Sequence, residues 1–383
     1  MTDPIYLDYN ATTPVAPEVL DAMLPWLREQ FGNPSSTHPL GRRAAQAVAT
    51  ARRQVADMIG AQPQEIVFTG CATEANNLAL LGVTRAVTVS GATERHLVIS
   101  AVEHPAVMAP AMQLREQGWH VTVLPVDTFG RVSPGQLGEA LRPDTALVSV
   151  MHANNEVGTL QPIADIAQLT RERGILLHTD AAQSAGKLPL NVDDLGVDLL
   201  TLAGHKFYAP KGVGALYVRG GTPILPVLHG ADHEAGLRPG TENVAAIVAL
   251  GAAAALVSDS LGTVPAHMRA LRDRLHGHLA AAIPGLQLNG HPEHRLPNTL
   301  HLSFPGVSGR ALLSAAEDVV AASVGSACHS EHDAVSGVLA AMGADAAHAA
   351  GAVRLSVGRM TTAEEIECAA RGLLAAWQRL KSR

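Results

Sequence analysis

The sequence predicts an α/β fold in which a mainly parallel sheet carries helices on both faces. Between about residues 60 and 220, short apolar runs alternate with longer amphipathic stretches, and this alternation is typical of strands joined by crossover helices. A second, shorter alternating pattern begins after about residue 260. The chain has 383 residues, of which 47% are hydrophobic. A chain of this length and composition can bury a core without disulfides or a structural metal.

The first pattern predicts a seven-stranded sheet, with strands at residues 66–68, 97–100, 120–124, 146–150, 175–179, 198–202 and 214–218. Between several of these strands, helices are predicted at residues 73–81, 106–117 and 163–173. In such sheets ligands bind beyond the carboxyl ends of the strands. Polar residues that directly follow a strand are therefore the first candidates for a functional site.

The second pattern predicts a smaller C-terminal α/β domain. An Ala-rich run at residues 244–257 is too short to span a bilayer and predicts a buried helix. A long helix at 264–282 follows, then strands at 300–304, 319–324 and 353–356 and helices at 309–316, 334–342 and 362–380. We expect a large domain over residues 15–260. Residues 1–14 and 261–383 are expected to form the small domain.

Composition excludes several classes of protein. Twenty-eight Lys and Arg against 35 Asp and Glu give a net charge of −7, which disfavours nucleic-acid binding through overall charge. Three cysteines do not make a disulfide framework and indicate a reducing compartment. Residues 1–10 lack an apolar segment, so we expect no signal peptide, no membrane association and a cytoplasmic location. Scattered histidines and the absence of the usual metal and nucleotide motifs predict no metal site.

An aspartate and a lysine at the ends of two predicted strands are the first candidate catalytic residues. Asp180 follows the apolar run 175–177, and Lys206 follows the strand at 198–202 within an uncharged stretch. Taken alone, the aspartate is more often a turn cap and the lysine more often a solvated surface residue. Together they suit pyridoxal phosphate, which needs a Schiff-base lysine and a partner for its pyridine nitrogen.

A phosphate group would need hydrogen-bond donors, and residues 69–76 supply a predicted strand-to-helix turn. The backbone amides of this turn and the Thr73 hydroxyl are suited to binding an anion at a helix N-terminus. The alternative is an ordinary helix cap, for which Thr73 is equally suitable.

These segments resemble the fold-type I pyridoxal-phosphate enzymes and, more closely, the cysteine desulfurases of the NifS/IscS kind. Further stretches match that family in order along nearly the whole chain, at residues 7–14, 32–36, 103–104, 154–159, 238–243, 325–328 and 354–359. The resemblance implies a homodimer that converts L-cysteine to L-alanine. It also implies sulfur transfer to an acceptor protein that serves iron–sulfur cluster assembly, tRNA thiolation or DNA phosphorothioation.

The resemblance also implies roles for individual residues at the cofactor. Lys206 would bind pyridoxal 5′-phosphate covalently, and Asp180 would pair with its pyridine nitrogen. Gln183 would bond the phenolic oxygen, and His104 would stack on the ring and transfer protons. The remaining cofactor contacts would come from Asn155 beside the ring, from Thr73 and His205 at the phosphate, and from Thr241 of a second subunit.

By the same resemblance, Arg354 and Cys328 of the smaller domain would act on the substrate and its sulfur. Arg354 would hold the substrate carboxylate together with Asn155, since a guanidinium binds carboxylates in a bidentate manner. Cys328 occupies the place of the family's nucleophile and would receive the sulfur as a persulfide. We expect no chemical role for Cys71 and Cys368.

Three residues depart from the family pattern: Ala203 replaces a frequent Ser, Asp232 adds an acid, and His329 follows the predicted nucleophile. Other functions therefore stay open within the same fold, namely a selenocysteine lyase or an aminotransferase. A sulfur-carrier scaffold with little activity of its own is an alternative of another class. A nicotinamide-binding protein is disfavoured because the glycine fingerprint is missing.

Overall fold

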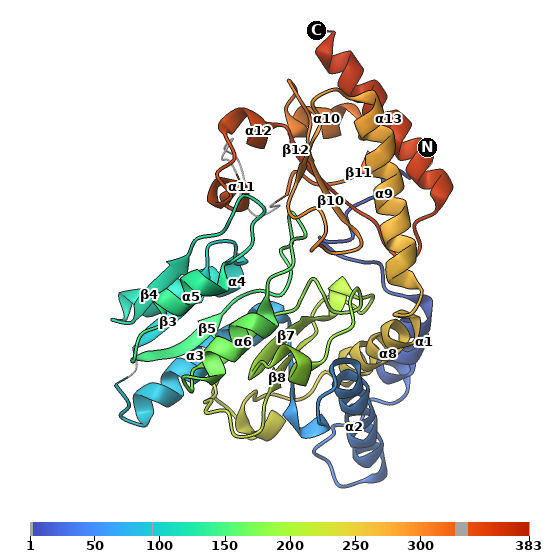
Figure 1. Ribbon diagram of the computed structural model, residues 1–383. Coiled ribbons are helices and arrows are strands. Elements are labelled where there is room, and N and C mark those ends of the chain that lie inside the picture. Colours follow the sequence, from blue (N-terminus) through green and yellow to red (C-terminus); the bar gives the residue numbers. More distant parts are fainter. Residues whose placement is uncertain (1–2, 94, 326–335, 383) are drawn as a thin grey trace.

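The structure, a computed structural model, describes residues 3–93, 95–325 and 336–382. A large seven-stranded sheet with its helices forms one part of the molecule, and two small sheets with α9 (Val264–Ala282) and α13 (Ala363–Lys381) form the other (Figure 1). The predicted α/β class is confirmed, and both alternating patterns correspond to real layers of structure.

The large sheet has the strand order β2-β8-β7-β6-β5-β3-β4. Neighbours from β7 to β4 run parallel, whereas β8 is antiparallel to both β7 and β2. Only residues 204–213 join β7 to β8, which is too short for the usual crossover helix. The seven predicted strands are confirmed as β2 (Ile66–Thr69), β3 (His96–Ser100), β4 (His120–Leu124), β5 (Thr145–Ser149), β6 (Leu176–Asp180), β7 (Leu199–Ala203) and β8 (Gly214–Val218).

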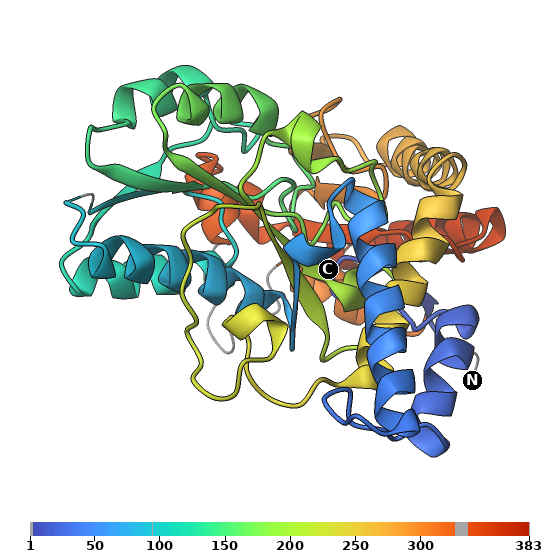
Figure 2. The same ribbon diagram turned by 90° about the horizontal axis from the view of Figure 1, so that it is seen from below.

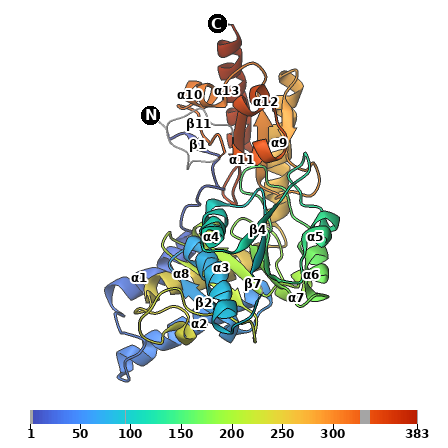
Figure 3. The same ribbon diagram turned by 90° about the vertical axis from the view of Figure 1, so that its left-hand side faces the viewer.

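Helices cover both faces of this sheet. Figure 3 shows α3 (Ala72–Val89) and α4 (Pro105–Glu116) on one face, and α5 (Pro134–Ala140), α6 (Ile163–Arg171) and α7 (Val192–Leu195) on the other. The predicted helices are confirmed, although α3 continues eight residues beyond its predicted end at residue 81. The sequence analysis did not identify α5 or α7, which are short.

The Ala-rich run forms the buried helix α8 (Val244–Ser260), as predicted. It packs against α1 (Pro17–Arg28) and α2 (Pro39–Ile59), which the sequence analysis did not identify (Figure 2). A Cβ atom at Gly251 would lie 2.5 Å from the Cα of Ala51, so glycine permits the close approach of α2 and α8. No single helix in the described ranges has the length and apolarity to cross a membrane, although α8 and α9 pass that test jointly as a pair bent by 75°.

The second part is built on an antiparallel sheet of β9 (Gln287–Asn289), β10 (Thr299–Ser303) and β12 (Ala352–Ser356). Together with α10 (Gly309–Ala315), α9 and α13 pack on it around a core that includes Leu275, Leu302 and Leu373. Leu7 belongs to this core as well. The proposed division into residues 15–260 and the remainder stays a prediction, and this separate core supports it.

One predicted strand and one predicted helix in this part need correction. The strand expected at 319–324 is only β11 (Val320–Ala321), and it pairs in parallel with β1 (Ile5–Tyr6). Because β1 comes from the N-terminus, local sequence around residue 320 gives no sign of this partner. The helix expected at 334–342 is α11 (Gly337–Ala341) within the described residues, and α12 (Ala346–Ala350) follows it.

Candidate active site

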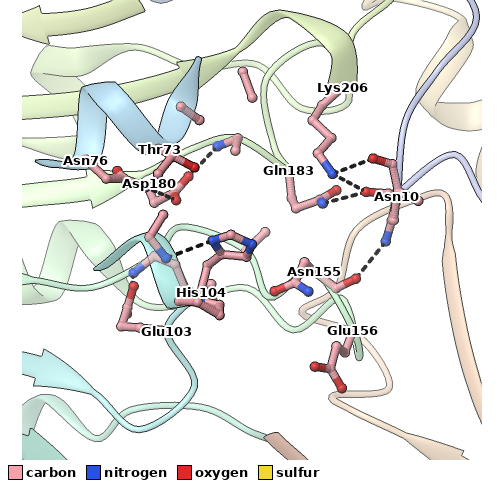
Figure 4. Close-up of a pocket in the computed structure, with 18 of the residues that line it drawn as sticks. Asn10, Thr73, Asn76, Glu103, His104, Asn155, Glu156, Asp180, Gln183 and Lys206 are labelled. Atoms are coloured by element: carbon pink, nitrogen blue, oxygen red, sulfur yellow. Dashed lines mark hydrogen bonds between the residues drawn. The ribbon is translucent and has the colours of Figure 1, made fainter. Parts of the chain in front are cut away.

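A pocket of about 290 Å³ lies at the carboxyl ends of β6 and β7, where the two parts of the molecule meet. A volume of this order suits a small ligand. The pocket brings together residues that are far apart in the chain, from Asn10 to Arg354. Figure 4 shows Asn10 beside Gln183 and Lys206. The predicted site residues that line the pocket are Thr73, His104, Asn155, Asp180, Gln183, His205, Lys206 and Arg354.

Asp180 is the last residue of β6, as predicted, and its carboxylate is held in place by two donors. The Asn76 Nδ2 donates to Oδ2 at 2.7 Å, and the backbone N–H of Ala182 donates to Oδ1 at 2.8 Å. Each carboxylate oxygen keeps a second acceptor position. The buried carboxylate is therefore fixed in orientation and can still accept a hydrogen bond from a ligand in the pocket.

Lys206 lies in the short 3₁₀ turn η2 (Gly204–Lys206) directly after β7. Its Nζ donates to the backbone carbonyl oxygens of Asn10 at 2.6 Å and Ala11 at 2.8 Å. The backbone of Tyr208 has a φ of 73°, in the left-handed region, and its N–H donates to the Thr13 Oγ1 at 2.9 Å. Strained backbone of this kind persists only where surrounding contacts hold it, so the N-terminal segment fixes the turn that presents the lysine.

His104 caps the N-terminus of α4 through its ring. Its Nδ1 accepts from the backbone N–H of Ala106 at 3.1 Å, which leaves the proton of the neutral imidazole on Nε2. Burial lowers the pKa of His104, the positive charge of Lys206 lowers it further, and Asp180 opposes both. The imidazole therefore favours the neutral form, which can donate the Nε2 proton and take one back at the same atom.

Among the residues that the structure describes, no side chain caps the N-terminus of α3. Cys71 occupies the N-cap position and makes no capping hydrogen bond, so the alternative of an ordinary cap at this turn is not what the structure shows. The Glu74 side chain turns away, accepting from Gly70 N at 2.7 Å and from Arg238 Nε at 2.8 Å. Unsatisfied amides and the helix dipole make such an end a site for an anion.

His205 completes this end of the pocket. Its Nδ1 lies 3.1 Å from the Thr12 Oγ1. Burial, with the charges of Lys206, Lys211 and Lys187, lowers the pKa of His205 to about 4. The ring is therefore neutral at neutral pH and offers one further hydrogen-bonding nitrogen.

Arg354, on β12, closes the opposite end of the pocket and is buried. Its Nη2 donates to the Asp8 Oδ1 at 2.7 Å, and its Nη1 donates to the Asn155 carbonyl oxygen at 3.0 Å. Within the described ranges, its Nε is buried without a hydrogen-bond partner. The guanidinium is oriented by two groups and retains donor capacity for a carboxylate.

Several residues of the site were missed by the sequence analysis. Asn10 accepts from Lys206 through its carbonyl and donates from Nδ2 to the Thr299 Oγ1 at 2.8 Å. Glu103 is buried, and its Oε1 accepts from the Ser100 hydroxyl at 2.5 Å and from Met151 N at 2.8 Å. Burial raises the pKa of Glu103 to about 8. Asn10, Glu103 and Asn76 all lie in segments that carry the family resemblance. Their place in these segments was the one signal in the sequence that could have identified them.

One predicted site residue lies away from the pocket, and another falls outside the described residues. Thr241 is exposed and does not line it in the single chain. Cys328 lies outside the described residues, as does His329, but Gly325, three positions before Cys328, lines the pocket. Of the other cysteines, Cys71 lines the pocket and Cys368 is exposed on α13.

Comparison with known proteins identifies the family. The aminotransferase class-V model matches residues 5–368. The cysteine desulfurase IscS of Dictyoglomus turgidum is 45% identical over 94% of this chain and 91% of its own length. The chain belongs to the cysteine desulfurases of the class-V aminotransferase family. The solved structure of a NifS-like protein covers 99% of the chain with a TM-score of 0.90 and 37% identity. That of SspA in complex with cysteine covers 93% of this chain and 99% of its own, with a TM-score of 0.82 and 37% identity.

Family membership confirms the predicted fold-type I architecture and the resemblance from which it was inferred. In this cysteine desulfurase, two of the departures noted in the sequence lie in described parts of the chain. Ala203 is buried and lines the pocket with a methyl group, and Asp232 is exposed and does not line it.

Proposed function

We propose that this chain binds pyridoxal 5′-phosphate and transfers the sulfur of L-cysteine to Cys328, releasing L-alanine. The observation that carries the proposal is the convergence of Asp180, Lys206, His104 and Arg354 on one pocket, with Gly325 of the cysteine-bearing segment on its wall. The named activity of the relatives supports the same reaction.

The donors and acceptors of the pocket fit pyridoxal phosphate. Asp180 offers an oriented carboxylate for a ring nitrogen, and the uncapped end of α3 offers amides for a phosphate. Thr73 and His205 line the same pocket and would add to the phosphate contacts, and Gln183 offers an amide group on the Lys206 side. When bound, the cofactor supplies a carbonyl carbon for amines and a ring that accepts electrons released at the substrate Cα.

The protein's own groups would then bind the substrate and move its protons. Arg354 would hold the α-carboxylate, with Asn155 beside it, and so fix the position of the substrate Cα in the pocket. Lys206, once displaced by substrate, would take the Cα proton at Nζ. His104 Nε2 would exchange protons with the substrate, because burial keeps the imidazole neutral.

Sulfur transfer assigns the last role to Cys328. Its thiolate would attack the substrate sulfur, the carbon–sulfur bond would break, and protonation of the remaining carbon skeleton would give alanine. One cysteine and one thiol thus yield one alanine and one persulfide, so no external oxidant is required. We further propose that the enzyme is a homodimer, with Thr241 acting across the interface, and that the persulfide sulfur passes to an acceptor protein in a reducing cytoplasm.

Borohydride reduction tests the cofactor assignment. The protein is incubated with pyridoxal phosphate, reduced, digested and mapped by mass spectrometry. The proposal predicts a phosphopyridoxyl group on Lys206 and none on the exposed Lys211, which serves as an internal control. A Lys206→Ala variant should take up no stable label. Modification spread over surface lysines with Lys206 unlabelled would refute the assignment.

A further inference from the structure

Lys187 is a buried lysine that the sequence analysis did not single out. It is 5% exposed and follows β6 by a compact turn, in which the Ala185 N–H bonds the Ala181 carbonyl at 3.0 Å. Gly186 has a φ of +71°, and a Cβ atom there would lie 2.7 Å from the Cβ of Phe207. Glycine at this position therefore lets the turn pack closely and carry the lysine inward.

The polar partners of Lys187 are unusual for a buried lysine. Its Nζ donates to the Gln183 carbonyl oxygen at 2.9 Å and to the Gln183 Oε1 at 3.3 Å. Within the described part of the chain no carboxylate pairs with it, and the charged groups that act on it are Lys206 and Arg354, both cations. The charge of Lys187 also lowers the pKa of His205. Burial of a lysine near two cations is costly, so a stabilising ion pair does not explain it.

The contact with Oε1 has a specific consequence for Gln183. Burial, with the charges of Lys206 and Arg354, lowers the pKa of Lys187 to about 7, and its Nζ carries N–H donors in either protonation state. Its bond to Oε1 therefore holds the amide oxygen of Gln183 toward Lys187 and the NH₂ group the other way. That NH₂ group donates from Nε2 to the Asn10 carbonyl at 3.0 Å. The same carbonyl accepts from Lys206 Nζ at 2.6 Å. The chain of bonds from Lys187 through Gln183 ends beside the predicted cofactor lysine.

We propose that Lys187 is a positioning residue that fixes the side-chain amide of Gln183 with its NH₂ group toward Lys206 and the bound cofactor. This inference rests on the proposed function, in which Gln183 donates to the phenolic oxygen of pyridoxal phosphate. Without Lys187, only the bond from the NH₂ group to the Asn10 carbonyl holds the Gln183 amide in this orientation, and the amide oxygen turns toward that site more often. A donor would then be replaced by an acceptor beside an oxygen that carries negative charge.

A double-mutant cycle tests the inference on the loaded enzyme without using turnover. The visible absorption of the bound cofactor is titrated with pH in wild type, K187M, Q183A and the K187M/Q183A double variant. A donor to the phenolic oxygen favours the form in which that oxygen is negative, so its loss raises the pH midpoint, by about one unit. We expect K187M to raise the midpoint in the wild-type background and to move it by less than half as much in the Q183A background.

Controls separate positioning from charge and folding. K187R keeps the donors and the charge and should restore at least half of the midpoint shift. K211M removes an exposed neighbouring cation and should leave the midpoint unchanged. If K187M does not bind the cofactor, K187R replaces it in the cycle. We then expect K187R to move the midpoint more when Gln183 is present than in the Q183A background.

The outcomes distinguish this inference from the proposed function. An unchanged midpoint in K187M, or a shift of equal size with and without Gln183, would overturn the positioning role while leaving the function intact. A wild-type protein that gains no visible band with pyridoxal phosphate would overturn both.

Discussion

Lys206 donates to the backbone carbonyl of Asn10 at 2.6 Å, although 196 residues separate them in the chain. The N-terminal segment thus passes directly beside the lysine that we assign to the cofactor. Gln183 binds the same carbonyl. A backbone acceptor cannot be removed by changing a side chain, so the position of this segment is set by its own anchors. The Asn10 side chain provides two of them, at Thr299 and Asn298.

The first prediction concerns the support of Asp180. Asn76→Ala removes the 2.7 Å donor to the carboxylate, leaving Oδ2 free to turn away from the ring nitrogen. Loss of a residue that orients a ligating group typically costs 10- to 100-fold in affinity. We expect weaker binding of pyridoxal phosphate, by about tenfold, in a fluorescence titration. Asn77→Ala, on the outer side of the same helix, is the matched control, and equal affinities in both variants would contradict the assignment.

The second prediction concerns Asp8 and Arg354. Asp8→Asn replaces the carboxylate that orients the guanidinium at 2.7 Å and leaves a buried cation without its ion pair. We expect KM for cysteine to rise about fivefold, with a smaller change in kcat, because the substrate carboxylate meets a less ordered arginine. Unfolding in urea should show a loss of about 2 kcal/mol. A variant with wild-type KM would argue that Arg354 does not bind substrate.

The third prediction concerns a structural ion pair. Glu234 is buried, binds Arg52 at 2.6 and 2.8 Å, and accepts from Phe68 N at 2.8 Å. Glu234→Gln should lower the free energy of unfolding by about 2 to 3 kcal/mol, since the partly buried Arg52 loses its charged partner. Glu18→Gln, from an exposed pair with Arg359 at 3.6 Å, should change it by less than about 0.5 kcal/mol. Similar losses in both variants would show that burial is not the cause.

The fourth prediction concerns pH. Burial lowers the pKa of His178 to about 3, below its ordinary value of 6.5. Between these values the unfolded chain binds the proton and the folded chain does not, so stability falls as pH drops below about 6.5. The loss is about 2 kcal/mol by pH 5 from this residue. Urea unfolding from pH 7 to 5 should show a shallower dependence in His178→Gln, whereas the exposed His120→Gln should match wild type.

Much of the fold was predictable because strands and helices in α/β proteins leave local periodic signals. The placement of Asp180 and Lys206 followed from a general rule about strand ends. The direction of β8 and the pairing of β1 with β11 depend on partners distant in sequence, so no local pattern marks them. The same holds for the supporting residue Lys187, and for Asn76 the only signal was its place in the same segment as Thr73. An ordinary polar residue acquires its role from what the fold brings beside it.

Sulfur transfer from labelled cysteine tests the central claim most directly. The holoenzyme is incubated with L-cysteine that carries a heavy sulfur isotope, and alanine release and the persulfide site are followed by mass spectrometry. We predict one labelled sulfur on Cys328 and alanine release that collapses in Cys328→Ser, with Cys71→Ser and Cys368→Ser remaining active. Alanine release by Cys328→Ser at the wild-type rate, or label on another cysteine, would contradict the account.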